Sequence, residues 1–215
     1  MRFRDRSEAG RLLAEALKDR VEPPCVVLAL PRGGVPVGLE IARALGCPLD
    51  LVMVRKIGAP GQPELALGAV ANGEHPVLVV NEDVRRMTGA SDAYLQSRKE
   101  KELAEIARRK ARYLAGRAPA PVEGRTAIVV DDGIATGATM LAALRAVRRK
   151  GPKKVILAVP VAPPDSLARL SGEADETVCL HTSEWFMAVG QFYDDFRQID
   201  DEEVVAALAE AAPED

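Results

Sequence analysis

Two adjacent carboxylates and two hydroxyl side chains stand close together in the middle of this chain. Asp131 and Asp132 follow the apolar run 127–130, and Thr136 and Thr139 come a few residues later. Carboxylates accept hydrogen bonds from sugar hydroxyls, whereas threonine hydroxyls and the N–H groups at a helix start bind phosphate. The residue types and their spacing therefore favour a site for a ribose 5-phosphate.

This stretch has the layout of a buried strand, a loop and a helix. The run 127–130 is rich in β-branched residues, which is typical of a buried parallel strand. Gly137 and Ala138 leave room for an anion to approach the backbone, and apolar residues then recur at helical spacing up to the stop at 150–152. An ordinary turn whose side chains cap the helix is the alternative. Capping accounts for one Asp or one Thr, but not for an Asp pair followed by Thr-Gly-x-Thr.

Segment 129–140, Val-Val-Asp-Asp-Gly-Ile-Ala-Thr-Gly-Ala-Thr-Met, resembles the phosphoribosyl-diphosphate (PRPP) signature of type I phosphoribosyltransferases. The resemblance implies an enzyme of nucleotide salvage that transfers the 5-phosphoribosyl group between PRPP and a nitrogenous base, with Mg²⁺ as cofactor and release of pyrophosphate. It implies that Asp131 and Asp132 are the catalytic carboxylates, which hold the ribose diol. It assigns the ribose 5-phosphate to a loop of five residues: Ala135, Thr136, Gly137, Ala138 and Thr139.

A second anion-binding loop follows the apolar run 26–30. It consists of Pro31-Arg32-Gly33-Gly34 and leads into a helical pattern. Taken alone, an ordinary strand–helix turn explains it equally well. Beside the PRPP signature it is similar to the family's pyrophosphate loop, with Arg32 and Gly33 as ligands. The peptide between Pro31 and Arg32 is expected to be strained or cis, as it often is in the loop that this one resembles.

Two further cations, Arg55 and Lys56, follow the run 49–54, which predicts a strand. Ligands bind at the carboxyl ends of strands in open parallel sheets, so both side chains are expected to bind pyrophosphate. A solvated strand end is the alternative. Residues 57–63 are rich in Gly and Pro, a composition typical of a mobile lid. The resemblance places a flexible loop over about residues 57–75.

Most of the aromatic residues lie late in the chain: Trp185, Phe186, Phe192, Tyr193 and Phe196. Packing in a hydrophobic core is one explanation. The resemblance favours a small hood over the nucleobase, in which Trp185, Phe186 and Phe192 bind the base through their flat faces. Mg²⁺ is expected to be held mainly by PRPP itself, with Asp194 as a further candidate ligand.

Ala135 bears on the choice of base. Hypoxanthine–guanine members of the family have an Asp there, which can exchange a proton with a ring nitrogen of a 6-oxopurine, and Ala135 cannot. Adenine-type members have Ala before Thr-Gly, but they usually place the hood at the N-terminus. The combination with a C-terminal aromatic cluster predicts a base pocket unlike either group. We expect no efficient use of hypoxanthine or guanine.

The composition excludes several classes of protein. With 215 residues, 47% hydrophobic and 28% charged, and a net charge of -3, the chain predicts one α/β domain with a small appendage and no basic field for nucleic acid. No apolar run is long enough to span a membrane. The expected partners are PRPP, a nucleobase or related nitrogenous acceptor, and a second copy of the chain in a homodimer.

The three cysteines, Cys25, Cys47 and Cys179, are scattered, and they have neither the spacing of a zinc site nor that of a disulfide framework. We therefore expect buried thiols in a cytoplasmic protein.

These patterns together predict an α/β fold with a parallel twisted sheet of about five strands flanked by helices, the type I phosphoribosyltransferase fold, and a small C-terminal hood. The core is expected over residues 1–180, and the hood with a final helix over 181–215. The sheet strands are predicted at 26–30, 49–54, 127–130, 155–161 and 176–180. An antiparallel pair, 65–71 and 77–80, is predicted around the turn Asn72-Gly73-Glu74.

Helices are predicted from Ser7 onward and over 35–45, 91–114, 165–170 and 202–211. The helix over 91–114 intersperses Glu with Lys and Arg, which favours a salt-bridged solvent face over a contact with nucleic acid.

Two other functions are alternatives to a phosphoribosyltransferase at this stage. The chain could be a PRPP-responsive regulator or partner-binding module without turnover, although the Arg55-Lys56 pair and the lid favour an enzyme. A nucleotide-binding oxidoreductase of Rossmann type is excluded, because no Gly-x-Gly-x-x-Gly follows a strand. The sequence does not reveal which base is the acceptor.

Overall fold

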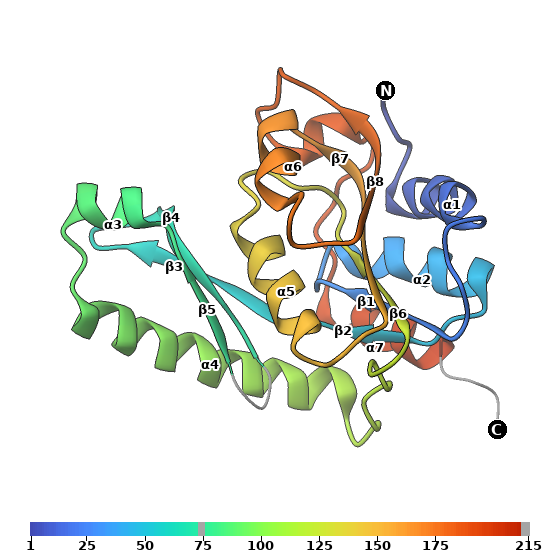
Figure 1. The fold of residues 1–215 in the computed structure, drawn as a ribbon, viewed down its shortest axis with the longest axis horizontal. Helices are drawn as coiled ribbons and strands as arrows, with labels where there is room; N and C mark the ends of the chain where they lie inside the picture. Colours follow the sequence, from blue (N-terminus) through green and yellow to red (C-terminus); the bar gives the residue numbers. More distant parts are fainter. Residues whose placement is uncertain (73–75, 212–215) are drawn as a thin grey trace.

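A five-stranded parallel sheet forms the core of the computed structural model, which describes residues 1–72 and 76–211 (Figure 1). The strand order is β2-β1-β6-β7-β8, and all neighbouring pairs are parallel. The strands are β1 (Cys25–Ala29), β2 (Leu49–Leu51), β6 (Thr126–Val130), β7 (Lys154–Ala162) and β8 (Glu176–Thr182). The predicted fold class is confirmed, and the two predicted anion loops follow adjacent strands, β1 and β6.

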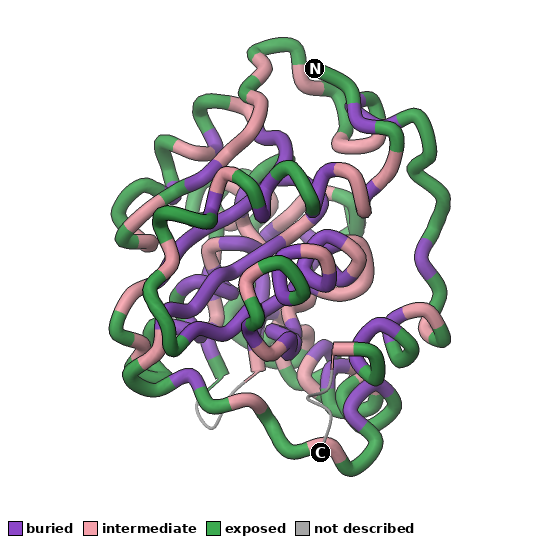
Figure 2. Tube along the Cα trace, turned by 90° about the vertical axis from the view of Figure 1, so that its right-hand side faces the viewer, coloured by how far each residue is buried: buried purple, intermediate pink, exposed green. Residues whose placement is uncertain are grey.

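Helices cover both faces of this sheet. They are α1 (Arg6–Leu17), α2 (Gly34–Leu45), α5 (Ala138–Arg148), α6 (Pro164–Leu170) and α7 (Asp201–Glu210). Successive strand residues point to opposite faces, so Val27 and Ile128 pack with α1, α2 and α7, whereas Leu28 and Val129 pack with α5. Figure 2 shows the buried positions concentrated along the central strands.

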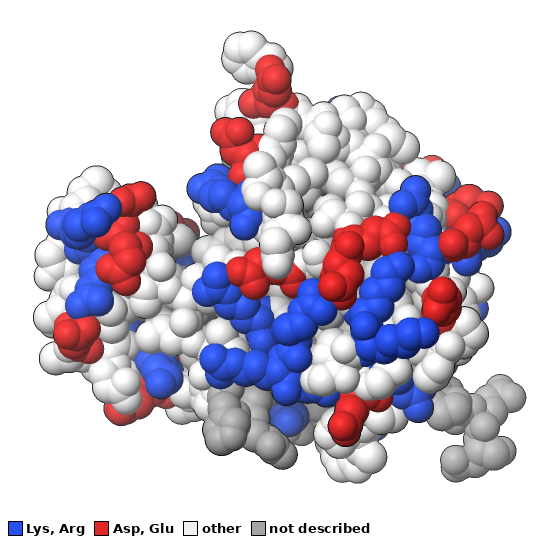
Figure 3. Space-filling model, in the orientation of Figure 1, with Lys and Arg blue, Asp and Glu red and all other residues white. Residues whose placement is uncertain are grey.

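A second, antiparallel sheet forms an arm, residues 54–72 and 76–114, on the left of Figure 1. Its elements are β3 (Val54–Ala59), β4 (Gln62–Ala71), β5 (Val77–Val80), α3 (Glu82–Thr88) and α4 (Asp92–Leu114). The predicted pairing of β4 with β5 is confirmed. Glu105 forms ion pairs with Arg108 and Arg109, as predicted for a salt-bridged helix, and Figure 3 shows both signs of charge interspersed on this view of the surface.

The segment predicted as an irregular lid, residues 57–63, is largely strand. β3 continues to Ala59 and β4 begins at Gln62. A Cβ on Gly58 would lie 2.5 Å from the carbonyl oxygen of Pro63, so this glycine permits a close approach of the two strands. The expectation that this segment is mobile without ligand and ordered with PRPP and Mg²⁺ stays a prediction. The predicted loop and its Asn-Gly turn run into residues 73–75, which lie outside the described residues.

The hood contains the N-terminal residues as well as the C-terminal ones that were predicted. The N–H of Phe3 donates to the carbonyl of Phe192, and the N–H of Asp194 donates to the carbonyl of Phe3, each at 2.8 Å. The short 3₁₀ helix η1 (Val189–Phe192) precedes this pairing. The side chains of Phe3, Phe192 and Tyr193 share one buried cluster. Both ends of the chain therefore contribute to the predicted hood. The apolar pattern of the sequence does not reveal the backbone hydrogen bonds that pair them.

Cys25 and Cys47 form a disulfide, so the prediction of free thiols at these positions is wrong. Val27 of β1 is paired with Leu49 of β2, and the two strands are parallel. Cys25 and Cys47, two residues earlier in each strand direction, therefore lie opposite one another. The sequence did not indicate the bond because all of α2 separates the two cysteines. Cys179 is free, and the argument from cysteines for a reducing compartment no longer holds. Within the described residues, no helix is long and apolar enough to cross a membrane.

Candidate functional site

The predicted signature forms the loop between β6 and α5. β6 ends at Val130 and α5 begins at Ala138. Gly137, just before the helix, has a φ of +81°, a left-handed conformation that glycine adopts without strain. The first N–H groups of a helix have no partner within it, so this end of α5 offers donors to an anion.

A cavity of about 560 Å³, here called the ribose cavity, lies beside this loop. Within the signature it is lined by Asp131 and by every residue from Gly133 to Met140. The five residues predicted to bind the ribose 5-phosphate therefore meet Asp131 in a single cavity. The remaining lining residues come from the arm, α6 and the hood: Lys56, Glu64, Leu65, Ala66, Asn81, Val84, Arg169 and Val189.

Two neighbouring elements hold the signature loop in place. The hydroxyl of the buried Ser166, on α6, donates to the carbonyl of Ala135 at 2.6 Å. The N–H of Ile134 donates to the carbonyl of Val161, on β7, at 2.9 Å. Arg169, three residues after Ser166 on α6, lines the cavity and adds a cation to it.

The second predicted loop lies directly beside the acidic pair. The N–H of Leu30 donates to the carbonyl of Val130 at 2.9 Å, which continues the β1–β6 pairing up to the two loops. The peptide between Pro31 and Arg32 is cis, as predicted. Arg32, Gly33 and Asp132 line a second cavity of about 390 Å³, here called the Arg32 cavity.

The two carboxylates of the signature face different cavities. Asp131 lines the ribose cavity, whereas Asp132 lines the Arg32 cavity. Arg6 donates from Nε to Asp132 Oδ2 at 2.8 Å, and side-chain exposures of 9% and 12% make this a buried ion pair. Only Asp131 is thus placed beside the phosphate loop, although the sequence suggested the same role for both.

Burial governs the charge of both carboxyls. Burial raises the pKa of Asp131 well above its usual range, and the neighbouring Asp132 raises it further. Burial also raises the pKa of Asp132, but the charge of Arg6 opposes this effect. Strongly shifted carboxyls in a cavity are typical of functional sites.

The predicted pyrophosphate cations Arg55 and Lys56 both lie on β3, and not at the end of the strand predicted over 49–54. Consecutive residues of a strand point to opposite faces. Lys56 accordingly lines the ribose cavity, where it pairs with Glu64 at 3.2 Å. Arg55 instead pairs at 3.0 Å with Glu102, whose side chain is 7% exposed, so the structure does not bring Arg55 into the cavity.

The predicted base-binding aromatics do not line the ribose cavity. Trp185 is 87% exposed, and Phe186 packs against the buried Phe192 with ring centroids 5.1 Å apart. Val189 is the hood residue that reaches the cavity. A Cβ on Gly133 would lie 2.6 Å from Val189 Cγ1, so the hood touches the signature loop there. A role for the three aromatics in base binding stays a prediction.

The described residues offer no metal site made by the protein alone. Among residues 1–72 and 76–211, no three His, Cys, Asp or Glu side chains are grouped to hold one. Asp194, the candidate ligand, forms an exposed ion pair with Arg2 at 2.6 Å. Mg²⁺ is often bound by one or two carboxylates together with substrate phosphates, and the site fits the ion only in that form.

Sequence reasoning missed several residues that reach these cavities, among them Arg6, Asn81, Arg169 and Val189. Arg6 belongs to the first turn of α1, where nothing in the local pattern points to Asp132. Arg169 carried a weak signal, because it follows the prolines that end the predicted strand 155–161, and strand ends of this edge bind ligands.

Comparisons with known proteins point to one family. A family model described as "Phosphoribosyl transferase domain" matches residues 6–197. Two Mycobacterium tuberculosis proteins, "Putative phosphoribosyl transferase Rv0571c" of strain H37Rv and "Putative phosphoribosyl transferase MT0597" of strain CDC 1551, are 51% identical over 209 residues. The match covers 97% of this chain and 47% of each relative, so the chain spans about half the length of these curated relatives.

Solved structures show the same fold. The crystal structure of TT1426 from Thermus thermophilus matches with a TM-score of 0.83 at 48% identity, over 99% of this chain and 100% of that chain. The AQ2163 protein from Aquifex aeolicus matches with a TM-score of 0.51 at 14% identity, over 83% of this chain and 74% of that chain, and shares the fold alone.

Proposed function

This chain belongs to the phosphoribosyl transferase family, and we propose that it transfers the 5-phosphoribosyl group between PRPP and a nitrogenous base, with release of pyrophosphate. One observation carries the proposal. Asp131, Thr136 and Thr139 line the same cavity at the start of α5. A carboxylate and a phosphate-binding loop in one cavity match the two ends of a ribose 5-phosphate.

The phosphate end of the substrate would lie on the start of α5. Backbone N–H groups and the hydroxyls of Thr136 and Thr139 can donate to the phosphate oxygens, and the helix dipole favours the negative charge. Arg169 adds a cation from α6. Asp131 would accept hydrogen bonds from the two ribose hydroxyls, because a carboxylate is an acceptor and each hydroxyl carries a donor.

The diphosphate would leave toward the loop after β1. Arg32 and Gly33 line the Arg32 cavity together with Asp132, whereas Asp131 lines the ribose cavity. A sugar cation of oxocarbenium type develops as the bond at C1′ breaks, so the site must stabilise positive charge on the sugar and negative charge on the diphosphate. Mg²⁺ bound through the diphosphate would neutralise part of that negative charge. Lys56 could supply a further cation once Glu64 releases it.

Little covalent chemistry remains for side chains in such a transfer. Positioning of the sugar by Asp131 and the phosphate loop, and electrostatic stabilisation of the leaving group, would supply most of the acceleration. The acceptor base would enter the ribose cavity, where Val189 presents an apolar surface.

The test is a screen of purines, pyrimidines and related nitrogen acceptors with labelled PRPP and Mg²⁺, followed by detection of both the nucleotide and pyrophosphate. We expect at least one base to give stoichiometric amounts of the two products. Binding of PRPP without pyrophosphate release for any acceptor would favour a regulator that uses PRPP as a signal. Failure to bind PRPP at all would exclude both functions.

A further inference from the structure

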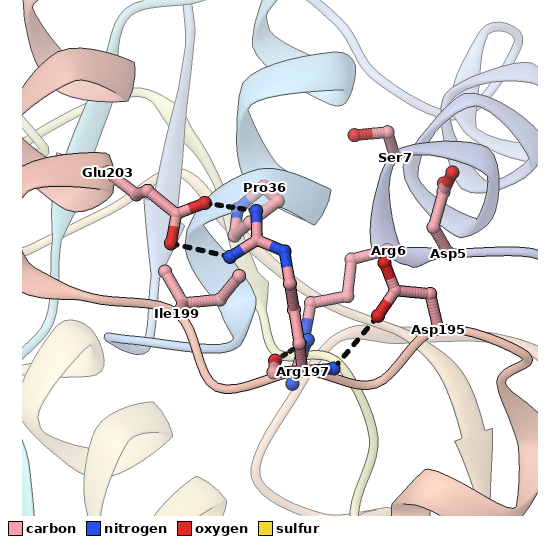
Figure 4. A pocket seen from close by; sticks show the side chains of 8 residues that line it. All are labelled: Asp5, Arg6, Ser7, Pro36, Asp195, Arg197, Ile199 and Glu203. Carbon is pink, nitrogen blue, oxygen red and sulfur yellow. Dashed lines mark hydrogen bonds and ion pairs between the residues drawn. The ribbon is translucent and has the colours of Figure 1, made fainter.

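Arg6 is held in one orientation by three contacts with two other segments of the chain. Its Nε donates to Asp132 Oδ2 at 2.8 Å, and its Nη1 donates to the carbonyl of Arg197 at 2.9 Å. Its guanidinium carbon lies 3.9 Å from the ring centroid of Phe196. Figure 4 shows Arg6 reaching from the start of α1 to the hood segment that carries Arg197. An arginine that is buried and bound at each of these points cannot move toward a ligand without losing these contacts.

The carboxylate of Asp132 is confined by the same arrangement. It lies between Arg6 and Gly33, and a Cβ on Gly33 would meet Asp132 Oδ2 at 2.1 Å. The phenol of Tyr193 donates to the backbone carbonyl of Asp132 at 2.6 Å, which fixes the backbone as well. Asp132 therefore contacts the proposed pyrophosphate loop and not the ribose cavity.

We propose that Arg6 is a positioning residue for the diphosphate end of the site: it neutralises Asp132, so that this carboxylate supports Gly33 without competing with diphosphate for Arg32. The inference rests on the proposed function, because it takes the Arg32 cavity as the place where diphosphate binds. It assigns to Asp132 a role different from that of Asp131, although the two are adjacent in the signature.

The physical reason lies in the charges that face Asp132. These are Arg6 from α1 and Asp131 beside it, with the neutral phenol of Tyr193 on the hood. Arg32, from the loop after β1, lines the same cavity and pairs with Asp201 of α7 at 3.5 Å. Without Arg6, a buried carboxylate loses its partner, and Arg32 is the other cation that lines the same cavity among the described residues. The carboxylate would then compete with Asp201 for Arg32 and repel an incoming diphosphate. A ligand on the phosphate loop of the ribose cavity would be affected much less.

The experiment measures the binding of two probes, inorganic pyrophosphate with Mg²⁺ and ribose 5-phosphate, by calorimetry on the full chain. For Arg6→Gln we expect pyrophosphate to bind at least about tenfold more weakly, and ribose 5-phosphate to bind with an affinity within about twofold of wild type. Arg6→Lys keeps the charge and should recover most of the pyrophosphate affinity. Arg11→Gln is the matched control, because Arg11 is on the same helix as Arg6 and its ion pair, with Glu40 of α2, is exposed. We expect no change for either probe.

The double variant Arg6→Gln/Asp132→Asn separates neutralisation from direct contact. If Arg6 acts by neutralising Asp132, removal of both charges restores pyrophosphate binding. A double variant that binds ribose 5-phosphate normally but pyrophosphate as weakly as Arg6→Gln would overturn the inference, and so would an equal loss of both probes in Arg6→Gln. If Arg6→Gln does not fold, the double variant and Arg6→Lys give the same comparison. A wild-type protein that binds neither probe would instead refute the proposed function.

Discussion

The carboxylate of Asp132 fills the space that a Cβ on Gly33 would need, because that Cβ would lie 2.1 Å from Asp132 Oδ2. The two residues belong to the loops that follow β1 and β6, which are paired from Cys25↔Thr126 to Ala29↔Val130. The proposed pyrophosphate loop and the acidic pair therefore pack against each other at the carboxyl ends of these two strands. A substitution in one loop is expected to disturb the other.

Gly33→Ala should disrupt this packing. The added methyl group must displace the Asp132 carboxylate, which Arg6 holds in place, so we expect a loss of about 1–3 kcal/mol in the free energy of unfolding and weaker binding of pyrophosphate. Denaturant unfolding and calorimetry measure the two effects. Gly172→Ala is the control, because a Cβ on Gly172 would have no atom within 4 Å. Equal stability and pyrophosphate affinity in both variants would show that Asp132 moves aside freely.

Asp131→Asn should make the unliganded protein more stable and less able to bind its substrate. Burial and the adjacent Asp132 raise the pKa of Asp131 in the folded chain, so its ionised form is held at a cost. A neutral amide removes that cost, and we expect a rise in Tm of about 2–4 °C at pH 7, which corresponds to about 1 kcal/mol for a chain of this size. Loss of a charge-assisted acceptor should weaken ribose 5-phosphate binding by about 1.5–3 kcal/mol. Unchanged ribose 5-phosphate affinity would remove Asp131 from the ribose site.

The same carboxyl predicts a pH dependence of stability. The folded-state pKa of Asp131 lies above the usual value of 3.8, so the folded chain binds this proton more tightly than the unfolded chain does. Between the two pKa values the free energy of unfolding therefore falls as pH rises. Unfolding curves at several pH values should show this contribution in wild type and not in Asp131→Asn. Parallel curves for the two proteins across that range would contradict the shift.

The signature itself was readable because its chemistry is local in sequence. Asp131 and residues 135–139 lie within a few positions of one another, between a strand and a helix that their own patterns predict. Contacts between distant segments were not readable. Arg6 pairs with Asp132 across the whole core, and Cys25 meets Cys47 only because β1 and β2 are in register.

Arg55 and Lys56 show a second limit. They were predicted to act together because they are neighbours after an apolar run. Strand geometry separates them, because β3 turns one toward Glu102 and the other toward the ribose cavity. The predicted strand 49–54 missed the boundary between two strands, because the apolar pattern continues across the end of β2 at Leu51 and the start of β3 at Val54. Binding of pyrophosphate by either cation stays a prediction.

Ser166→Ala should loosen the signature loop. The Ser166 hydroxyl is buried and donates to the carbonyl of Ala135 at 2.6 Å, so its removal leaves that carbonyl without this donor. We expect a loss of about 0.5–1.5 kcal/mol in stability and weaker binding of ribose 5-phosphate, with pyrophosphate binding retained. Ser171→Ala is the control, since this exposed hydroxyl bonds only the nearby carbonyl of Ala168 on its own helix. Similar ribose 5-phosphate affinities in the two variants would show that α6 does not support the site.

Thiol titration in denaturant should find one free thiol without reductant and three after reduction. The free thiol is Cys179, because Cys25 and Cys47 are joined. The Cys25→Ser/Cys47→Ser variant should lose about 3 kcal/mol of stability by the loop-entropy model, since the bond closes a loop with a sequence separation of 22. We expect its ribose 5-phosphate affinity to stay unchanged, because neither cysteine lines the ribose cavity. Three reactive thiols in the untreated protein would contradict the disulfide.

The identity of residue 135 should decide which bases are used. Ala135 is exposed on the wall of the ribose cavity, and its methyl group cannot exchange a proton with a 6-oxopurine. The predicted hood contains residues from both ends of the chain. An N-terminal hood is usual in adenine-type members, whereas the C-terminal aromatic cluster is not. We therefore expect low turnover with hypoxanthine and guanine, and adenine remains a candidate acceptor.

Steady-state rates of pyrophosphate release with the three bases test this prediction. Ala135→Asp places a proton-exchanging group at the cavity wall. We expect its rate with hypoxanthine to rise by up to about 100-fold, which is the lower end of the usual contribution of general acid–base catalysis. Ala135→Asn is the control, because it has nearly the same shape and cannot exchange a proton. A gain in rate is assigned to proton exchange only if Ala135→Asp is faster than Ala135→Asn. Equal rates for the two variants, or a wild-type turnover near the usual median of about 10 s⁻¹ on hypoxanthine, would show that this base is recognised without a carboxylate at residue 135.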